Sequence, residues 1–347
     1  MEIQQAIETA SKFVYKGRTA EVSYGLETIQ IEGGKVVGHN LISGVIVSID
    51  DKNLSAAVDA KKLVRTMKAC GKNPRLDVND RFVHIRGDGG GFKLPVHEIK
   101  DIPRIKEPPK DARWITVESE DYAAIKGVMW SVSDDSTRQH MTGVYFADDW
   151  VQAISGHCLS RCRLSEGIME RLGSKTPISV LPEALVGLAG EVEMCIYEKK
   201  CFARVNDEIR VTQVQDVAMP SAESIMKAID NMAPITTSRT DLLETVKRAL
   251  VVGNAGVLIS VKGNKMIVSC DDNDSKFSFT HAIDIEKTDG DMKDGCVLVS
   301  GNYIQSALEE VENDVVEIRV DWDPSGSLNP VFVFGKRYQS VIMPMRI

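Results

Sequence analysis

The sequence predicts an α+β protein made of three copies of one domain, each with two helices packed on antiparallel sheet. Two observations carry this prediction. Two separate helical patterns each occur three times along the chain with the same step, and alternating apolar and polar stretches follow each of them. The step is about 120 residues, which is close to the length of an ordinary single domain. Two patterns that stay in phase three times indicate an internal repeat.

Both helical patterns place apolar residues three and four positions apart, which is the period of one helix face. The first pattern consists of Ile3, Ala6, Ile7 and Ala10, then Tyr122, Ile125 and Met129, then Leu243, Val246 and Leu250. The second consists of Ala60, Leu63, Val64 and Met67, then Leu181, Ala184, Leu185 and Leu188, then Tyr303, Ile304, Ala307, Leu308 and Val311. We therefore expect two helices in each copy.

The stretches between the helical patterns predict antiparallel strands. In the last copy, Val316 and Ile318 alternate with Glu317 and Arg319, which is the period of a strand with one buried face. Glycine- and proline-containing turns separate these short stretches, as hairpins require. Gly87 to Gly91 lies between two such stretches and is interpreted as a hairpin turn rather than a phosphate-binding loop.

Irregular joints at 101–113 and 218–238 divide the chain into predicted domains 1–113, 114–234 and 235–347. Three independent domains on a string would satisfy the same pattern. Equal spacing and short joints favour a regular arrangement, in which neighbouring sheets pair edge to edge and protect their edges.

Composition bounds the function. The chain has 347 residues and a formal net charge of −8, so a generally basic nucleic-acid binder is disfavoured, although a single basic face is compatible with it. It has no apolar run of the roughly 20 residues that span a bilayer and no signal-peptide pattern, so we expect a cytoplasmic protein without membrane contact. Seven scattered cysteines are expected to be reduced and buried, with no metal or other cofactor.

Four segments resemble a known family. They are Val341 to Ile347 (VIMPMRI), Ser155 to Leu159 (SGHCL, similar to an Asp-Gly-His-Arg-Leu segment), Arg138 to Phe146 (RQHMTGVYF), and the helix 62–70 followed by FKLPV. In this order and spacing they resemble the beta subunit of bacterial DNA polymerase III, the DNA sliding clamp, over essentially the whole chain.

The resemblance implies a homodimeric ring that encircles duplex DNA without reading its sequence. It implies a non-catalytic processivity factor that tethers the replicative polymerase. The clamp loader and other proteins would also bind, through short linear motifs. The two copies would meet head to tail, with the strand around Phe92 and Leu94 of one copy beside Val251 and Val252 of the other.

The resemblance also places basic helices around the DNA. Lys61, Arg65 and Lys68 fall at helical spacing opposite an apolar stripe, so this helix is expected to present a basic face. The full set of predicted DNA-binding residues is Lys12, Lys16, Arg18, Lys61, Lys62, Arg65, Lys68, Lys126, Arg138, Lys247 and Arg248. A solvated helix face is the alternative for any one of them.

A groove for partner peptides is implied near the C-terminal segment. Its predicted lining is Met141, Ile154, Gly156, His157, Leu159, Pro220, Ile225, Val341, Ile342, Met343, Pro344 and Met345. Cys158 and Ser224 stand where the family usually has arginine, and Gln139 and His140 where aromatic pairs occur, so we expect an altered peptide preference. Ordinary packing between domains is the alternative for these residues.

Two other functions remain open. A clamp-fold adaptor would recruit replication or repair partners without encircling DNA. A hydrolase would use Cys158 as nucleophile and His157 as base, but no orienting carboxylate or oxyanion signature accompanies them. No catalytic residue is therefore assigned.

Overall fold

The computed structural model describes residues 1–17, 24–99, 102–174, 176–216, 222–227, 229, 232, 234–253, 256–272, 274–287 and 294–346. The chain folds as two compact units. The N-terminal unit comprises 1–122 and 169–215, and the C-terminal unit comprises 123–168 and 216–347. These units do not coincide with the three domains expected from the sequence, and those boundaries stay a prediction.

One structural motif occurs six times in the described chain: a helical segment followed by three consecutive antiparallel strands. Motifs one to six end at β3, β7, β11, β15, β19 and β24. A strand directly precedes the helical segment in motifs two to six. Two motifs fill each predicted domain, so the expected alternation of helices and antiparallel sheet is confirmed.

Motifs one and two lie in the N-terminal unit. Their elements are α1 (Ile3–Ala10), η1 (Tyr24–Glu27), β1 (Thr28–Glu32), β2 (Lys35–His39), β3 (Ser43–Ser48), β4 (Ser55–Asp59), α2 (Ala60–Ala69), β5 (Arg75–Val78), β6 (Phe82–Gly87) and β7 (Gly90–Pro95). The strands form two sheets, with the orders β4-β1-β2-β3 and β5-β6-β7.

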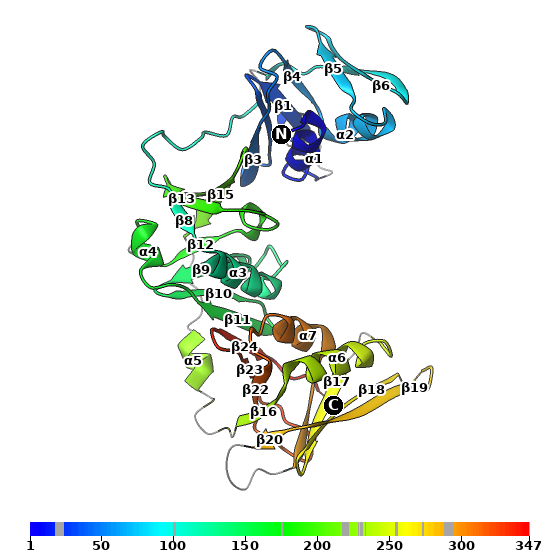
Figure 1. Cartoon of the computed structure of the whole chain (residues 1–347), viewed down its shortest axis with the longest axis vertical. Coiled ribbons are helices and arrows are strands. Elements are labelled where there is room, and N and C mark those ends of the chain that lie inside the picture. The colour runs from blue at the N-terminus through cyan, green and yellow to red at the C-terminus, as the bar shows by residue number, and fades with distance from the viewer. Residues whose placement is uncertain are drawn as a thin grey trace. The chain divides into compact units, whose positions relative to one another are not determined.

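Helices α1 and α2 lie side by side (Figure 1) and pack on these strands through one apolar face each. In α2, Leu63 and Met67 are fully buried, while Asp59 caps the helix by accepting a hydrogen bond from the Lys62 backbone N–H. Ile7 of α1 belongs to the same buried cluster. The periodicities that predicted both helices therefore mark the faces that the core uses.

The rest of the N-terminal unit contains β8 (Ile115–Val117), α3 (Ser119–Val128) as far as Tyr122, α4 (Ile168–Arg171) from Met169, β12 (Ile178–Val180), η5 (Pro182–Ala184), β13 (Val192–Tyr197), β14 (Lys200–Val205) and β15 (Glu208–Gln215). The helix expected around Leu181 to Leu188 was wrong in extent, because only the single turn η5 forms. Gly187 and Gly190 have φ values of 72° and 121°, a left-handed conformation that ends a helix.

A first joint links motifs one and four by pairing β3 with β15 over Ser43–Val47 and Glu208–Thr212. The Ser43 and Thr212 hydroxyl oxygens lie 3.1 Å apart in its buried interior. The guanidinium of Arg210 lies 5.6 Å from the Phe13 ring centroid and pairs with Glu208. The pairing of β3 with β15 gives the backbone N–H and C=O groups of both strand edges hydrogen-bond partners.

The C-terminal unit contains η3 (Met129–Ser131), η4 (Gln139–Met141), β9 (Val144–Ala147), β10 (Trp150–Ile154), β11 (Cys158–Arg163), α5 (Ala222–Met226), β16 (Pro234–Ser238), α6 (Arg239–Ala249), β17 (Gly256–Lys262), β18 (Lys265–Asp272), β19 (Phe277–Asp284), β20 (Glu286–Lys287), β21 (Gly295–Ser300), α7 (Gly301–Glu309), β22 (Val315–Arg319), β23 (Val331–Phe334) and β24 (Tyr338–Ile342). One sheet runs β9-β10-β11-β24-β23-β22-β16, and a second runs β19-β18-β17-β21.

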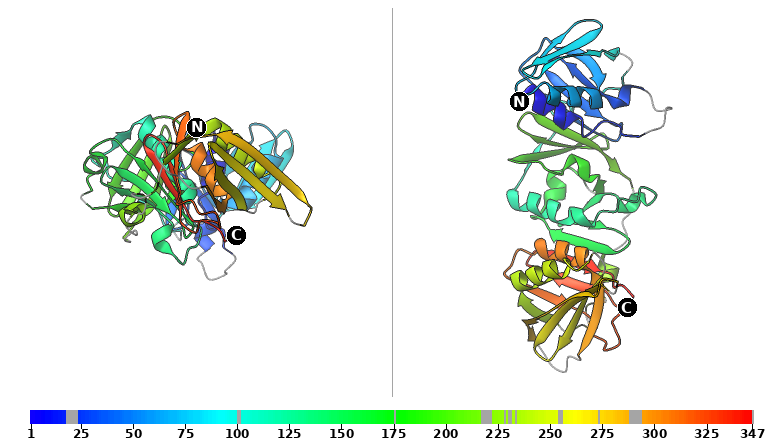
Figure 2. Two further views of the ribbon diagram at one scale, coloured as in Figure 1. Left: turned by 90° about the horizontal axis from the view of Figure 1, so that it is seen from below. Right: turned by 90° about the vertical axis from the view of Figure 1, so that its right-hand side faces the viewer.

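A second joint pairs β11 with β24 from Cys158↔Ile342 to Cys162↔Tyr338. On its inner face, Trp130 Nε1 donates a hydrogen bond of 3.0 Å to the Tyr338 hydroxyl, and its ring lies 6.2 Å from that of Tyr303 on α7. Helices α6 and α7 also pack side by side (Figure 2). None of the described helices is long and apolar enough to cross a membrane.

We expect Leu63→Ala to lower the free energy of unfolding by about 2–5 kcal/mol, because it leaves a cavity in a fully buried position of α2. The neighbouring exposed Lys62→Ala is the matched control and should change it by less than about 0.5 kcal/mol. Urea titration followed by circular dichroism measures both. A decrease below about 1 kcal/mol for Leu63→Ala would contradict the packing described.

Candidate functional site

The exposed face of α2 is basic. Lys61, Lys62, Arg65 and Lys68 are all exposed, while the opposite face of the helix is buried in the core. Lys68 Nζ lies 3.9 Å from a Glu8 carboxylate oxygen, both side chains being largely in solvent. The sequence pattern therefore identified a solvent-facing row of positive charge, not a buried network.

A cavity of about 630 Å³ adjoins this row in the N-terminal unit. Lys16, Lys61 and Arg65 line it together with Tyr15, and the acidic residues Glu27 and Asp59 also belong to its lining. The exposed Lys12 lies just beyond α1, and Arg18 is outside the described residues. The structure thus brings three of the predicted cations of this region together around one cavity: Lys16, Lys61 and Arg65.

The remaining predicted DNA-binding cations are less uniform. Lys126 on α3 and Arg248 on α6 are exposed, whereas Lys247 forms ion pairs of 3.6 Å with Glu244 and Glu309. Arg138 lies outside the helices, and its guanidinium would contact a Cβ built on Gly156 at 3.1 Å. Its place is beside the predicted partner groove, not on a basic helix face.

Seven of the predicted groove residues cluster on the outer face of the second joint or extend it. Ile154, Leu159 and Val341 are buried in one apolar cluster with Ala222 and Met226 of α5. Met141 and Ile225 pack against the same cluster. Figure 1 shows α5 alongside β24. The exposed Met343 and Met345 continue from β24, with exposed fractions of 45% and 38%.

The C-terminal segment is held by backbone hydrogen bonds. Met343 N donates to the His157 carbonyl (2.9 Å), and Met345 N donates to the Leu298 carbonyl (2.7 Å). Pro344 forms a bridge with Val299. Gly156 and His157 are exposed beside this segment, whereas Ile342 is fully buried. Ile342 therefore lies in the core, and Pro220 is outside the described residues.

Sequence reasoning missed a polar part of the same outer face. Arg161 lies 9% exposed with its guanidinium 4.4 Å from the Trp150 ring centroid, and it bonds to Glu223 and Gln339. Arg163 lies on the same face of β11. Leu159, Arg161 and Arg163 alternate along a strand, so their shared face is a signal that the sequence contains.

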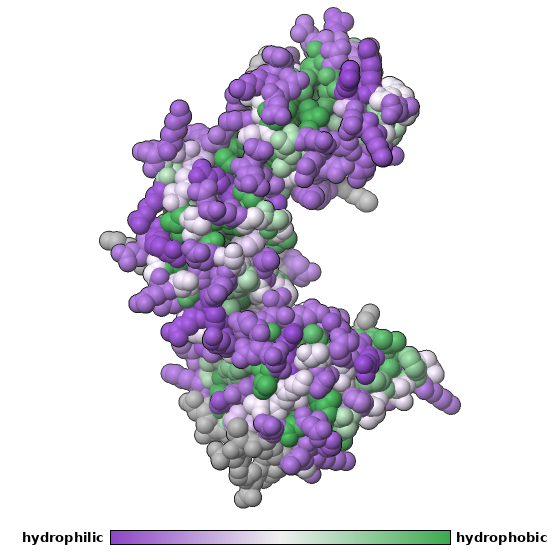
Figure 3. All heavy atoms as spheres, viewed as in Figure 1, coloured by the Kyte–Doolittle hydropathy of each residue, from purple (hydrophilic) through white to green (hydrophobic). Residues whose placement is uncertain are grey.

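Two strands present unpaired outer edges. Among the described strands, none pairs with the outer edge of β7 or of β19. Both edges carry an exposed aromatic residue, Phe92 (39%) and Phe277 (50%). Val251, just beyond α6, is 73% exposed, while Leu94 and Val252 are each 8% exposed. Apolar residues are visible among hydrophilic ones on the surface beside β19 (Figure 3).

No family model matches the sequence, and no curated protein matches it. Solved structures match over nearly the whole chain. The DNA polymerase III beta subunit from Thermotoga maritima matches with a TM-score of 0.77 and 16% identity, covering 100% of this chain and 97% of that one. A putative beta subunit from Eubacterium rectale gives 0.79 and 17% with coverage of 100% and 98%, and the Bacillus subtilis sliding clamp gives 0.78 and 15% with coverage of 99% and 97%.

The chain has the fold of the DNA sliding clamp. The predicted fold class is therefore confirmed at full length. Another structure of this fold, the clamp from Bartonella birtlesii, is bound to griselimycin. At these identities the likeness establishes the fold, and the roles of individual residues rest on the geometry of this chain.

The environment of Cys158 does not favour a nucleophilic thiolate. Burial raises the pKa of its thiol, an effect that the hydrogen bond from Ser155 only partly offsets, so the reactive thiolate is scarce at neutral pH. The neighbouring His157 ring stacks on Tyr303 at a centroid distance of 6.3 Å. Both observations favour a structural position in the groove wall.

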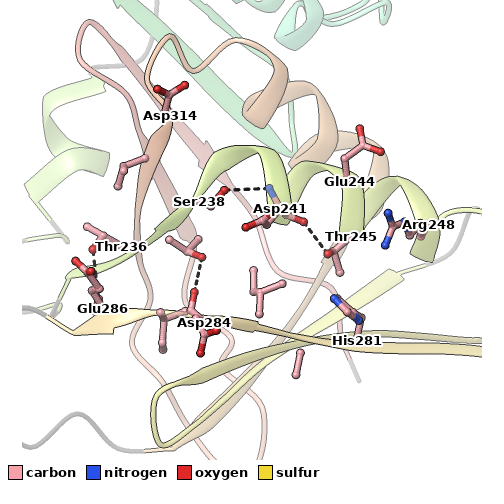
Figure 4. Close-up of a pocket in the computed structure, with 15 residues that line it drawn as sticks. Thr236, Ser238, Asp241, Glu244, Thr245, Arg248, His281, Asp284, Glu286 and Asp314 are labelled. Atoms are coloured by element: carbon pink, nitrogen blue, oxygen red, sulfur yellow. Dashed lines mark hydrogen bonds between the residues drawn. The ribbon is translucent and has the colours of Figure 1, made fainter.

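A second cavity of about 630 Å³ lies between α6 and β19 (Figure 4). Its labelled charged side chains include Asp241 and Glu244 along α6 and His281 and Asp284 on β19. Across the described residues, no group of three or more His, Cys, Asp or Glu side chains is arranged to hold a metal ion. This acidic cavity is therefore not assigned a ligand.

We expect one thiol per chain to react readily with a disulfide reagent at pH 8 in the folded protein. Six of the seven cysteines are buried, and only Cys296 is partly exposed. Cys296→Ser should remove the fast reaction and Cys158→Ser should leave it intact, while all seven thiols react in urea. Loss of the fast reaction in Cys158→Ser would instead show an accessible, activated Cys158.

Proposed function

We propose that the protein is a non-catalytic DNA sliding clamp. Two copies close head to tail around duplex DNA and tether a replicative polymerase for processive synthesis. The observation that supports this most directly is the rule by which the six motifs pair their last strands. Each predicted domain, 1–113, 114–234 and 235–347, supplies two motifs to the ring.

Both joints within the chain follow one rule. The last strand of motif one pairs with that of motif four (β3·β15), and the last strand of motif three pairs with that of motif six (β11·β24). Each odd motif thus pairs with the motif three places further on. By the same rule the last strand of motif five, β19, needs a strand from motif two, β7, of a second copy. A head-to-tail pairing of this kind leaves neither edge open.

The apolar contacts of the second joint indicate which residues meet at the proposed seam, where β19 of one copy pairs with β7 of the other. Trp130 lies two residues beyond the buried Val128 that ends α3. It contacts Tyr338 on β24, the strand that pairs with β11 in the same chain. Val251 lies two residues beyond the corresponding buried Ala249 of α6. Its exposed side chain therefore occupies the position from which Trp130 makes its contact, and it faces the segment that carries Phe92 in the partner copy.

The charges beside the two free edges are complementary. The β5-β6-β7 sheet carries the exposed cations Arg75, Arg86 and Lys93 and one exposed carboxylate, Asp77. Strands β18 and β19 carry Asp271, Asp272 and Asp284 and one cation, Lys265, which pairs with Asp284 at 2.6 Å. The first sheet is therefore net positive and the second edge net negative. Opposite charges favour association of unlike edges and oppose pairing of like edges. The other edge of the basic sheet, β5, is only four residues long and has alternating exposed side chains, which limits pairing there.

The basic face of α2 supplies contacts to DNA. Lys61, Arg65 and Lys68 contact phosphates, which are the same for every sequence. A closed ring retains DNA by topology, so these contacts stay weak enough for sliding. The apolar cluster at the second joint, with Met343 and Met345 beside it, receives short linear motifs of the polymerase and the loader.

A clamp-fold adaptor that does not encircle DNA is the second candidate. The observation that favours it is the partial neutralisation of the inner cations, since Lys247 pairs with two glutamates and Lys68 lies close to Glu8. The net charge of −8 points the same way.

We expect Phe92→Asp to convert the dimer into monomers, because it places a charge at the apolar centre of the seam. Sedimentation velocity at micromolar concentration measures the change. Leu328→Asp is the matched control, since Leu328 is 69% exposed and follows Ser327, whose N–H bonds to Cys296 of β21 at the opposite edge of the sheet from β19. A native protein that sediments as a monomer, or a Phe92→Asp variant that remains a dimer, would overturn the seam.

We expect the triple substitution Lys61→Glu, Arg65→Glu and Lys68→Glu to weaken binding to a short DNA duplex. The slope of log affinity against log salt should fall by roughly 0.9 for each phosphate that the variant no longer neutralises. Fluorescence anisotropy across a salt series measures both effects. The control reverses three exposed lysines elsewhere, Lys52, Lys110 and Lys199, and should retain the native slope. Equal slopes of log affinity against log salt in the native protein, the triple variant and the control would favour the adaptor.

A further inference from the structure

The outer face of β10, β11 and β24 changes character along the strands. Its first row, Ile154–Leu159–Val341, is apolar and belongs to the cluster under α5. The second row, Gln152–Arg161–Gln339, is polar, and the third row pairs Trp150 with Arg163. Directly paired residues share a face of the sheet, so an apolar patch and a cationic strip adjoin each other.

Arg161 is held in place on this face. Its Nε donates to the Gln339 side-chain oxygen (2.6 Å), and its Nη1 donates to a Glu223 carboxylate oxygen on α5 (3.3 Å). The Trp150 ring lies 4.4 Å from its guanidinium carbon. Glu223 is 70% exposed, so this carboxylate reaches Arg161 from the solvent side. A carboxylate from another molecule can approach the strip along the same side.

Two more guanidinium groups extend the strip. Arg163 is exposed, with its guanidinium 5.9 Å from the Trp150 ring. Its backbone carbonyl accepts hydrogen bonds from Arg337 Nε (2.8 Å) and Nη2 (2.6 Å). Arg161, Arg163 and Arg337 therefore gather within two strand rows. The acidic residues of these rows are Glu223 on α5 and Asp149, which directly precedes β10. These three guanidinium groups lie together on a chain whose total charge is −8.

We propose that this surface, Arg161 and Arg163 with Trp150, recognises acidic residues flanking an apolar linear motif seated at the adjoining patch. The proposal rests on the proposed function, since it names the chemistry of the peptide that the partner groove takes. The charge complementarity of the strip argues for an acidic flank, because guanidinium groups bind carboxylates through charge-assisted, frequently bidentate hydrogen bonds.

The spacing along β11 sets where the acidic residues fall. Arg161 and Arg163 follow Leu159 by two and four residues, or about 7 and 14 Å at roughly 3.4 Å per residue. An extended peptide has a similar rise. Its carboxylates therefore lie two to four residues from the side chain anchored near Leu159. Trp150 holds the cations close to the strand, which reduces the conformational freedom that they give up on binding.

The test uses fluorescein-labelled peptides with the apolar core Leu-Ala-Leu-Phe. Pairs of Asp, Ser or Lys are placed three residues before or after the core, and a further peptide has the Asp pair but Ser throughout the core. Anisotropy at about 50 mM salt gives the dissociation constants. We expect one Asp-flanked peptide to bind about three- to tenfold more tightly than its Ser-flanked counterpart, and the Lys-flanked peptide more weakly.

Arg163→Glu is the informative variant, because substitutions of exposed side chains usually change the free energy of unfolding little. It should remove the preference for Asp and leave the affinity of the Ser-flanked peptide unchanged. Arg113→Glu, an exposed arginine in the 102–113 segment, is the matched control and should retain the preference. Glu223→Gln should strengthen binding of the Asp-flanked peptide, since it removes the competing carboxylate.

The outcomes separate the two proposals. Equal binding of Asp- and Ser-flanked peptides, or a preference that persists in Arg163→Glu, overturns the acidic-flank proposal and leaves the partner groove standing. Binding of the Asp peptide without its apolar core at full affinity also overturns it, because charge alone would then suffice. If no peptide with the apolar core binds, the groove and this proposal both fail.

Discussion

The backbone of an edge strand is the constraint on which the rest of this molecule depends. A β-strand at the side of a sheet presents N–H and C=O groups that need partners, and unpaired edges associate with other chains. The chain satisfies two pairs of such edges internally, through β3·β15 and β11·β24. Among the described strands, β7 and β19 keep unpaired outer edges. Their exposed Phe92 and Phe277 and their opposite charges are suited to contact with a second copy. In the proposed ring, oligomerisation follows from the pairing rule of the motifs, and the basic α2 face would contact DNA only once the ring is closed.

The internal joints combine backbone pairing with specific inner contacts. The first joint adds the buried Ser43 and Thr212 hydroxyls and Arg210 against Phe13, and the second adds Trp130 against Tyr338 and Tyr303. At the second joint, the side chain of Glu310, just beyond α7, lies against α3, and a Cβ on Gly127 would meet its carboxylate oxygen at 2.8 Å. Burial, reinforced by the charge of Glu309, raises the pKa of this Glu310 carboxyl. The outer side of the same joint gathers the apolar cluster and the arginines, so one strand pair builds both the internal joint and the proposed partner surface.

Much of this fold is predictable from periodicity, because helix faces such as Ile7 on α1 and Leu63 on α2 are fixed by local spacing against the core. The prediction fails at Leu181 to Leu188, where apolar spacing alone does not register that Gly187 and Gly190 take left-handed conformations. The groove is different in kind. Leu159 and Val341 are far apart in sequence and meet through β11·β24, so only the family resemblance brought them together beforehand. The Arg161–Trp150 contact was within reach of strand alternation but requires knowing which strands are neighbours. Arg138 was predicted among the DNA-binding cations, whereas its position beside Gly156 depends on the fold.

Disulfide trapping tests the head-to-tail seam most directly. Phe92→Cys and Val251→Cys are placed in one chain that also carries Cys296→Ser, so that the introduced thiols are the exposed ones. On mild oxidation the double variant should form a covalent dimer linked at both seams, and each single variant should stay monomeric on a denaturing gel. Crosslinking of the Phe92→Cys variant to itself, or the absence of any crosslink in the double variant at concentrations where the protein is dimeric, would contradict closure through β7 and β19.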